Sequence, residues 1–505
     1  MPLILWLASA SSACLLLLLL ALELQLGRAP RLRASDSRER PEGCSWLRIL
    51  VPAYNEHDNI ADCLQAIVAA APTDWPIELV VIDDASSDDT QALAEAMREA
   101  CPRTDLRWSI VQAGPRPNGE RWSGKNWPAS VGAALSWPEA DPASQWLLFL
   151  DADVRLRPGV IEAALQEACA QQSDLLTLAP RLECSCLAEW LVQPIVATLL
   201  GLGFPIRRSN DPDDPTAFAA GPFMLFRHSS YLAIGGHRGV ASEVVEDLAL
   251  ARKIKQSQLR LRYLLGVDLV DLQMYRTLAA LWEGWTKNWF LGVDRNGFKA
   301  VGSVGVVLLL FAAPWLSAAV LLLQWVLLGS VLRPTLAAVL ASLVLVLAIR
   351  LWSAWRFGTP IRYWWLSWLG ALLIAAIVPA SIWKTTWKQM RQELGNQLTP
   401  TRGDKDYTIY SLRSSYITNQ IEEGKDIYLV KQLTGHSLEI LIRHYDRSDV
   451  KKRRSEATAR TYSRKRSQQK EIDLNNLDSQ NSSAAEITWT VQTLKKAKSQ
   501  VSSNQ

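Results

Sequence analysis

Four long apolar runs most constrain what this 505-residue chain can fold into. They cover residues 2–26, about 302–329, about 334–350 and about 363–383. A helix needs about 20 mostly apolar residues to cross a bilayer, and each run is near or above that length. Twelve of the 22 tryptophans lie between residues 282 and 388, mostly near the ends of these runs, and tryptophan favours the headgroup level. We therefore predict a multi-pass membrane protein.

The first run, residues 2–26, is either an uncleaved anchor or a cleaved signal peptide. No basic residues precede it, as they would in a signal peptide. Five arginines follow between residues 28 and 40, and such residues stay on the cytoplasmic side. We expect an anchor in the plasma or inner membrane, with the soluble part in the cytoplasm. A fourth full span would place Lys384, Lys388 and Arg391 outside, so one run is a candidate re-entrant or interfacial segment.

Cysteine and charge usage narrow the functional classes. The seven cysteines include no CxxC pair, so they indicate neither a disulfide framework nor a zinc site and agree with a reducing compartment. The chain holds 54 basic and 50 acidic residues, and this balance argues against nucleic acid as a specific partner. Residues 401–505 are different, with 19 basic and 13 acidic side chains.

These features divide the chain into five segments. Residues 2–26 are the anchor, and residues 45–300 have the composition of a soluble domain. Residues 302–388 hold about three membrane helices. Residues 401–450 form a separate fragment, and residues 451–505 are a basic tail that we expect to be disordered.

Alternating strands and helices predict an α/β fold for the soluble domain. Buried strands are expected at residues 47–52, 77–82 and 146–150, with helices from about Asn59 and over residues 91–100. This alternation is typical of a parallel sheet. A polar cluster follows each strand, and the carboxyl ends of such strands share one edge. We therefore expect one crevice to hold all three clusters.

The last of these clusters suggests a metal. Asp151 and Asp153 follow the third strand, and carboxylate oxygens suit Mg²⁺ or Mn²⁺ completed by phosphate oxygens and waters. Aspartate is also common in surface turns, which is the alternative explanation of the pair. The two further polar clusters favour the metal.

The ordered motifs resemble those of family 2 glycosyltransferases, which have the GT-A nucleotide-diphospho-sugar fold. The resemblance covers about residues 47–300 and rests on Val51–Glu56, Val81–Ser86, Asp151–Asp153 and Glu246–Asp247. Further segments resemble membrane-bound members that glycosylate carotenoid- or hopanoid-type lipids: Ala219–Phe226, Ile234–His237, Val245–Arg252, Met274–Arg276 and Trp282–Asn288.

The resemblance implies roles for individual residues. Asp247, after Glu246, would be the general base, and Asp153 with Asp151 would hold the metal and nucleotide. Lys125 would lie near the diphosphate. The remaining implied nucleotide-sugar contacts are Pro52, Ala53, Tyr54, Glu56, Asp83 and Asp84.

The chemistry agrees with these roles. A metal can neutralise a leaving diphosphate, and a base must reach the acceptor hydroxyl. One base without a protein nucleophile gives in-line displacement and inversion. Glu246 and Asp247 also suit the start of a helix, since acidic residues favour its dipole.

Two other features remain open between function and structure. His237 follows two glycines and either touches phosphate or acceptor or is a loop histidine. The aromatic residues Trp282, Trp285, Trp289 and Phe290 either bind the acceptor or lie at the membrane surface, which we favour.

The acceptor is expected to be a lipid, because spans on both sides tether the domain near the bilayer. Processive synthases of the family usually carry a Gln-x-x-Arg-Trp motif after the base, and residues 275–282 (YRTLAALW) lack it. We therefore expect a single sugar to be added. The alternative is a polysaccharide synthase of the same superfamily.

The fragment at residues 401–450 resembles the C-terminal end of tyrosine recombinases. Arg413, His436 and Tyr445 match an arginine, the histidine and the nucleophile of that family. The family's upstream arginine and lysine have no place here, because membrane spans precede the fragment. We interpret it as an inactive remnant. A membrane-anchored DNA-binding protein is the alternative of another class.

Overall fold

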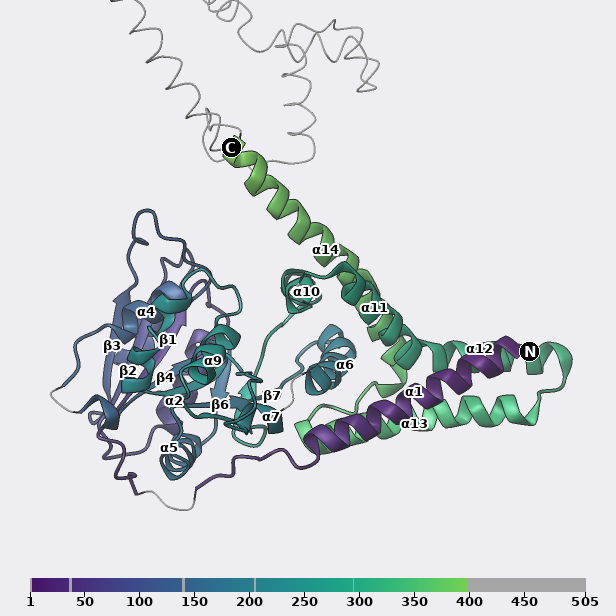
Figure 1. The fold of residues 1–505 in the computed structure, drawn as a ribbon, viewed down its shortest axis with the longest axis horizontal. Coiled ribbons are helices and arrows are strands. Elements are labelled where there is room, and N and C mark those ends of the chain that lie inside the picture. Colours follow the sequence, from purple (N-terminus) through teal and green to yellow (C-terminus); the bar gives the residue numbers. More distant parts are fainter. Residues whose placement is uncertain (1, 36–38, 139–140, 204–205, 294, 398–505) are drawn as a thin grey trace, which may run out of the picture. The chain divides into compact units, whose positions relative to one another are not determined.

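The computed structural model describes residues 2–35, 39–138, 141–203, 206–293 and 295–397, and within these ranges side chains from residue 3 to 387. The chain up to Met390 forms one compact unit. Its described part contains a large mixed sheet, a small sheet and a set of long apolar helices (Figure 1). This organisation confirms the predicted α/β domain with apolar helices before and after it.

The large sheet has seven strands in the described residues, in the order β3-β2-β1-β4-β8-β6-β9. All neighbours are parallel except β8, which is antiparallel to both β4 and β6. The sequence indicated only parallel strands, because an antiparallel insertion leaves no local signature. The bounds are β1 Trp46–Ala53, β2 Ile77–Asp83, β3 Arg107–Gln112, β4 Gln145–Leu150, β6 Leu175–Ala179, β8 Phe223–Arg227 and β9 Leu261–Leu265.

A small sheet lies in the same unit. It has the order β5-β10-β7, with β5 Val154–Leu156, β7 Arg181–Leu182 and β10 Val270–Leu272. Strand β5 begins directly after Asp151–Asp153, so β4 and β5 fix both ends of that acidic turn.

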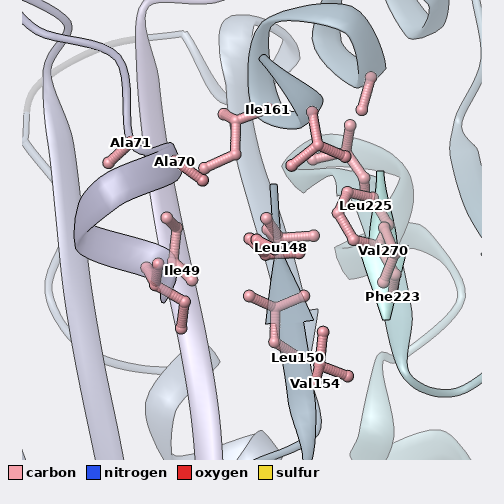
Figure 2. Packing of buried hydrophobic residues seen from close by; sticks show 14 of the residues in the cluster. Ile49, Ala70, Ala71, Leu148, Leu150, Val154, Ile161, Phe223, Leu225 and Val270 are labelled. Carbon is pink, nitrogen blue, oxygen red and sulfur yellow. The ribbon is translucent and has the colours of Figure 1, made fainter. Parts of the chain in front are cut away.

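Alternate residues of the central strands enter two separate cores. Ile49 and Leu148 pack on one face of the sheet, while Leu50 and Phe149 pack on the other. Figure 2 shows the first core, where Ile161 also packs. Side chains of a strand point alternately to opposite faces, so strands covered by helices on both sides are apolar throughout.

Helices cover both faces. The first face is covered by α2 Ile60–Ala70, α3 Thr90–Glu99 and α5 Val160–Ala170. The second face is covered by α4 Asn126–Ala133, α8 His228–Ala233 and α9 Glu246–Gln256. The sequence placed the starts of α2 and α3 within one residue of their observed positions.

Four helices in the described residues are long and apolar enough to span a membrane. They are Leu3–Leu26 in α1 (Pro2–Leu26), Gly297–Leu328, Arg333–Phe357 (α13) and Trp364–Trp387 in α14 (Ser367–Gln397). The second combines α11 Gly297–Val307, a π-helical turn at Leu308–Ala312 and α12 Ala313–Leu328. Pro314 follows that turn, and proline removes a helical hydrogen bond.

The apolar helices are joined directly to the sheet. Leu32 N–H donates to the Leu265 carbonyl at 2.9 Å, and Leu265 N–H donates to the Pro30 carbonyl at 2.9 Å, so the segment after α1 pairs with edge strand β9. The Arg31 guanidinium donates to the carbonyl of Arg356 at 2.5 Å. The end of α13 therefore lies beside the same segment. Three further helices, α6 Leu187–Gly203, α7 Ile206–Asn210 and α10 Leu278–Gly292, complete this junction.

Candidate active site

A polar cavity of about 730 Å³ opens at the carboxyl ends of β1, β2 and β4. This is the edge at which open α/β sheets bind ligands. The structure brings nine of the residues singled out in the sequence into the lining of this cavity: Pro52, Ala53, Tyr54, Glu56, Asp84, Lys125, Asp151, Asp153 and Glu246.

Side-chain hydrogen bonds hold the turns after β1 and β2 together. Asn55 has a positive φ of 54°, and its Oδ1 accepts from Ser87 N–H at 2.8 Å. Glu56 N–H donates to Thr90 Oγ1 at 2.7 Å. Asparagine tolerates this left-handed conformation better than most residues. The turn after β1 is thereby fixed, with Tyr54 and Glu56 in the cavity wall.

The two aspartates after β2 have different environments. Asp84 lines the cavity and accepts from the Arg116 guanidinium at 2.6 Å. Asp83 is buried, and its Oδ2 accepts from Ser86 N–H at 3.2 Å. Asp83 therefore shapes the turn, whereas Asp84 is the aspartate of this pair that faces the cavity.

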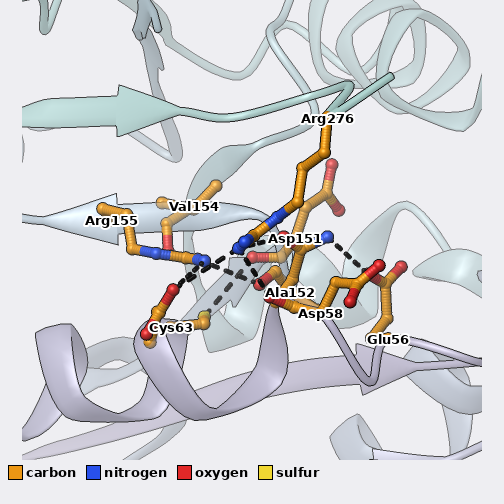
Figure 3. A network of polar contacts seen from close by, with 10 residues as sticks. Glu56, Asp58, Cys63, Asp151, Ala152, Val154, Arg155 and Arg276 are labelled. Atoms are coloured by element: carbon orange, nitrogen blue, oxygen red, sulfur yellow. Dashed lines mark hydrogen bonds and ion pairs between the residues drawn. The ribbon is translucent and has the colours of Figure 1, made fainter. Parts of the chain in front are cut away.

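Three carboxylates crowd the floor of the cavity. Burial, followed by the charges of Asp151 and Glu56, raises the pKa of Asp153 to about 8. Burial also raises the pKa values of Glu56 and Asp151. Asp153 Oδ1 is buried and has no hydrogen-bond partner among the described residues. Figure 3 shows Glu56, Asp151, Arg155 and Arg276 within one network of polar contacts.

This donor set fits a divalent cation. No group of three or more His, Cys, Asp or Glu side chains within the described ranges has the arrangement of a complete metal site. Mg²⁺ is commonly bound by one or two carboxylates together with substrate phosphates. Asp151 and Asp153 supply such a pair, and the unpartnered Oδ1 of Asp153 is available as a ligand.

Lys125 links the floor to the start of α9. Its Nζ donates to Asp151 and lies 3.2 Å from Glu246 Oε1. Burial opposes the charged form of Lys125, but the two carboxylates outweigh it and raise its pKa. Its side chain is 30% exposed, so this ammonium can contact a ligand in the cavity.

Asp247 lies in the first turn of α9 and is held by two main-chain donors. Its Oδ2 accepts from Gly221 N–H at 2.9 Å, and its Oδ1 accepts from Leu248 N–H at 2.7 Å. Burial, followed by the charge of Glu246, raises the pKa of Asp247 to about 6. Such a carboxylate is basic enough to take a proton near neutral pH.

Residues 48–235 match the family model described as "Glycosyl transferase family 2". Residues 48–235 thus form a domain similar to those of this family. The large mixed sheet and the acidic turn after β4 have the organisation of a GT-A core.

Curated relatives of this chain include the 4,4'-diaponeurosporenoate glycosyltransferases of Staphylococcus aureus. The protein of strain MRSA252 is 26% identical over 270 residues, and that of strain USA300 is 25% identical over 270 residues. The match covers 53% of this chain and 66% of each relative, so the chain spans about two thirds of their length.

Solved structures with a similar chain path include a mannosyltransferase from Pyrobaculum calidifontis in complex with GDP-Man and Mn²⁺. It is 18% identical, with a TM-score of 0.43, and the match covers 75% of this chain and 98% of that one. The S. aureus TarS structure is 17% identical, with a TM-score of 0.31, covering 48% of this chain and 38% of that one.

The chain has a second cavity, of about 310 Å³ and mostly apolar, beside the first. Asp247 lines this second cavity, while its neighbour Glu246 lines the polar one. The start of α9 thus presents one carboxylate to each of the two cavities. Trp285 also lines the apolar cavity, whereas Trp282 is 38% exposed.

One residue considered as functional from the sequence lies outside both cavities, and one cavity residue was missed. His237 is buried, its Nδ1 is 2.8 Å from the Tyr231 hydroxyl, and it lines neither cavity. Burial lowers its pKa to about 3, so it is a neutral packing residue. Arg116 lines the polar cavity but was missed, because the partly exposed strand β3 before it was not recognised.

The positions Arg413, His436 and Tyr445, which resemble a recombinase, lie outside the described residues. Lys287 and Asn288, from α10, also line the polar cavity, and sequence reasoning gave them no individual role.

Proposed function

We propose that this chain is a glycosyltransferase that moves a sugar from a nucleotide-diphospho-sugar, a UDP-sugar, to a lipid acceptor with inversion at the anomeric carbon. The observation that carries this proposal is the position of Gly221. A Cβ at this glycine would lie 3.1 Å from Asp247 Oδ2 and 3.4 Å from Lys125 Nζ. A residue without a side chain therefore lies between a base in the apolar cavity and a cation in the polar cavity.

The polar cavity suits the donor. Lys125, Arg116 and Lys287 line it, and three cations can bind the charge of a diphosphate. Pro52, Ala53, Tyr54 and Asp84 would contact the nucleoside. Asp151 and Asp153 would hold Mg²⁺ or Mn²⁺, which when bound would stabilise the leaving diphosphate as a Lewis acid.

Asp247 is the proposed general base. It takes the proton of the acceptor oxygen while that oxygen attacks the anomeric carbon from the side opposite the diphosphate. A single displacement inverts that carbon. The Gly221 and Leu248 N–H groups orient the carboxylate, and Glu246 keeps Lys125 in place beside it.

A lipid acceptor is supported by two observations. Four apolar helices accompany the domain. The segment after α1 pairs with β9 through main-chain hydrogen bonds, and the side chain of Arg31 in that segment donates to the Arg356 carbonyl at the end of α13. The S. aureus relatives are named for glycosylation of 4,4'-diaponeurosporenoate. Carotenoid- and hopanoid-type lipids are therefore the acceptors to test first, at the cytoplasmic face of the plasma or inner membrane.

Transfer into extracted lipid tests the proposal. Membranes containing the full chain are incubated with Mn²⁺ and labelled UDP-sugars, and the label in a solvent-extractable fraction is measured. We expect Asp247→Asn to reduce transfer about 10²–10⁴-fold, as loss of a general base does. Asp213→Asn, an exposed aspartate outside both cavities, is the matched control.

The other outcomes separate the alternatives. Label in insoluble polymer would identify a polysaccharide synthase instead. Equal transfer by the wild-type protein and Asp247→Asn would remove Asp247 from the reaction. No transfer to any lipid with any donor, by folded protein, would contradict the proposed function.

A further inference from the structure

The apolar cavity connects the proposed base to the ends of two membrane helices. Asp247 and Gly221 line it, and so do Leu26, the last residue of α1, and Phe357, the last residue of α13. Asp247 is its one charged lining residue in the described part of the chain. The cavity therefore starts at the site of chemistry and reaches the level where the apolar helices end.

Helix α6 narrows the cavity near those helix ends. Ala197 and Gly201 line it one turn apart, hence on one face of α6. A Cβ at Gly201 would lie 2.8 Å from Leu26 Cδ1 and 3.3 Å from Phe357 Cζ. Any side chain at Gly201 would have to displace these two residues or enter the cavity.

Trp285 belongs to the same wall. An apolar enclosure with one carboxylate is the composition expected for a ligand with a hydrocarbon body and an oxygen-bearing end.

We propose that this cavity is the acceptor subsite and takes the hydrocarbon end-on, with the acceptor oxygen at Asp247 and the chain leading past Gly201 towards the membrane. The inference rests on the proposed function and adds the binding site to it. A volume of about 310 Å³ is at the small end of ligand pockets, so it holds one slender chain end rather than a whole lipid.

The test compares two glycines of one helix. In Gly201→Leu the new side chain fills the cavity, whereas in Gly203→Leu it does not, because nothing lies within 4 Å of an added Cβ at the exposed Gly203. We expect Gly201→Leu to raise the KM for a long-chain lipid acceptor about tenfold or more. Its KM for the UDP-sugar and its slow donor hydrolysis should stay unchanged, and Gly203→Leu should behave as wild type.

A second variant and a labelling experiment guard against misfolding. Ala197→Leu narrows the same cavity one helical turn away. It should likewise raise the KM for the acceptor and leave the KM for the donor unchanged. In the wild-type full chain, a long-chain alcohol with a diazirine near its hydroxyl should label α6 or α10, and a non-reactive alcohol of equal length should compete.

Each result decides the matter. Wild-type transfer with an unchanged acceptor KM in both folded cavity variants would overturn the subsite while leaving the proposed function intact, whatever the label marks. If both variants misfold, the labelling experiment decides. The proposed acceptor subsite is then overturned if neither α6 nor α10 shows labelling that the non-reactive alcohol reduces. Absence of wild-type transfer would instead overturn the proposed function.

Discussion

At the scale of single residues, the carboxylate of Glu246 raises the pKa of its neighbour Asp247. The charge of Glu246 is the second cause, after burial, of the raised pKa of Asp247, about 6. Because the base acts when deprotonated, transfer should fall as pH drops below about 6. Glu246→Gln removes a negative charge, lowers the pKa of Asp247, and should move this acid limb of kcat/KM to lower pH.

The pH profile of kcat/KM for the lipid acceptor measures this shift. Glu243→Gln, on the loop just before α9 and outside both cavities, is the matched control. An acid limb that stays in place in Glu246→Gln, or moves to higher pH, would contradict the assignment of Asp247 as the titrating base.

Single residues also show what the sequence could predict. Asp151 and Asp153 were recognisable because a buried strand precedes them and the carboxyl ends of strands share one edge. Gly221 was not recognisable as a boundary between cavities, because its distances to Asp247 and Lys125 arise from the meeting of three separate segments. The position of Trp285 in the lining of the apolar cavity was hidden for the same reason. In the sequence, a tryptophan near a long apolar run has the same pattern whether it faces lipid or a cavity.

At the scale of elements, Arg48 attaches helix α4, and with it Lys125, to the sheet. Arg48 lies in β1, and its side chain is 1% exposed. It donates to Glu78 Oε2 in β2 at 2.7 Å and to the carbonyls of Leu135 and Ser136, just after α4, at 3.0 and 2.7 Å. One guanidinium thus joins two strands to the end of the helix.

We expect Arg48→Ala to destabilise the domain by roughly 3 kcal/mol, because it leaves a carboxylate and two carbonyls without their donor. Arg48→Lys should be intermediate, since a lysine keeps the charge but loses the planar fork. Thermal unfolding of the purified protein measures both, and Arg98→Ala at the end of α3 is the control. A melting temperature of Arg48→Ala equal to that of the control would contradict this role.

The elements were more predictable than their pairing. The apolar strands β1, β2 and β4 and the four long apolar helices have strong local patterns, and they lie close to where the sequence indicated. The position of β8 between β4 and β6 depends on long-range pairing, and no local pattern in Phe223–Arg227 fixes its direction. The same antiparallel strand brings Pro222 to Asp151, whose N–H donates to the Pro222 carbonyl at 3.4 Å.

At the scale of the whole molecule, both cavities are formed by a limited part of the chain. Their lining residues fall between Leu26 and Thr359, so the proposed donor and acceptor sites require the soluble domain together with α1 and α13. The recombinase-like positions Arg413, His436 and Tyr445 lie outside the described residues. Catalysis should therefore be independent of the basic C-terminal segment.

Deleting residues 401–505 tests this independence. We expect the shortened protein to keep the kcat/KM of the full chain for donor and acceptor, because all lining residues in the described part of the chain are retained. Transfer is measured per amount of folded protein in the membrane, so that altered expression is not mistaken for altered catalysis. Tyr445→Phe in the full chain should likewise leave transfer unchanged, whereas Asp247→Asn should reduce it about 10²–10⁴-fold. The reverse pattern would mean that the C-terminal segment carries the activity and would favour a DNA-directed function over sugar transfer.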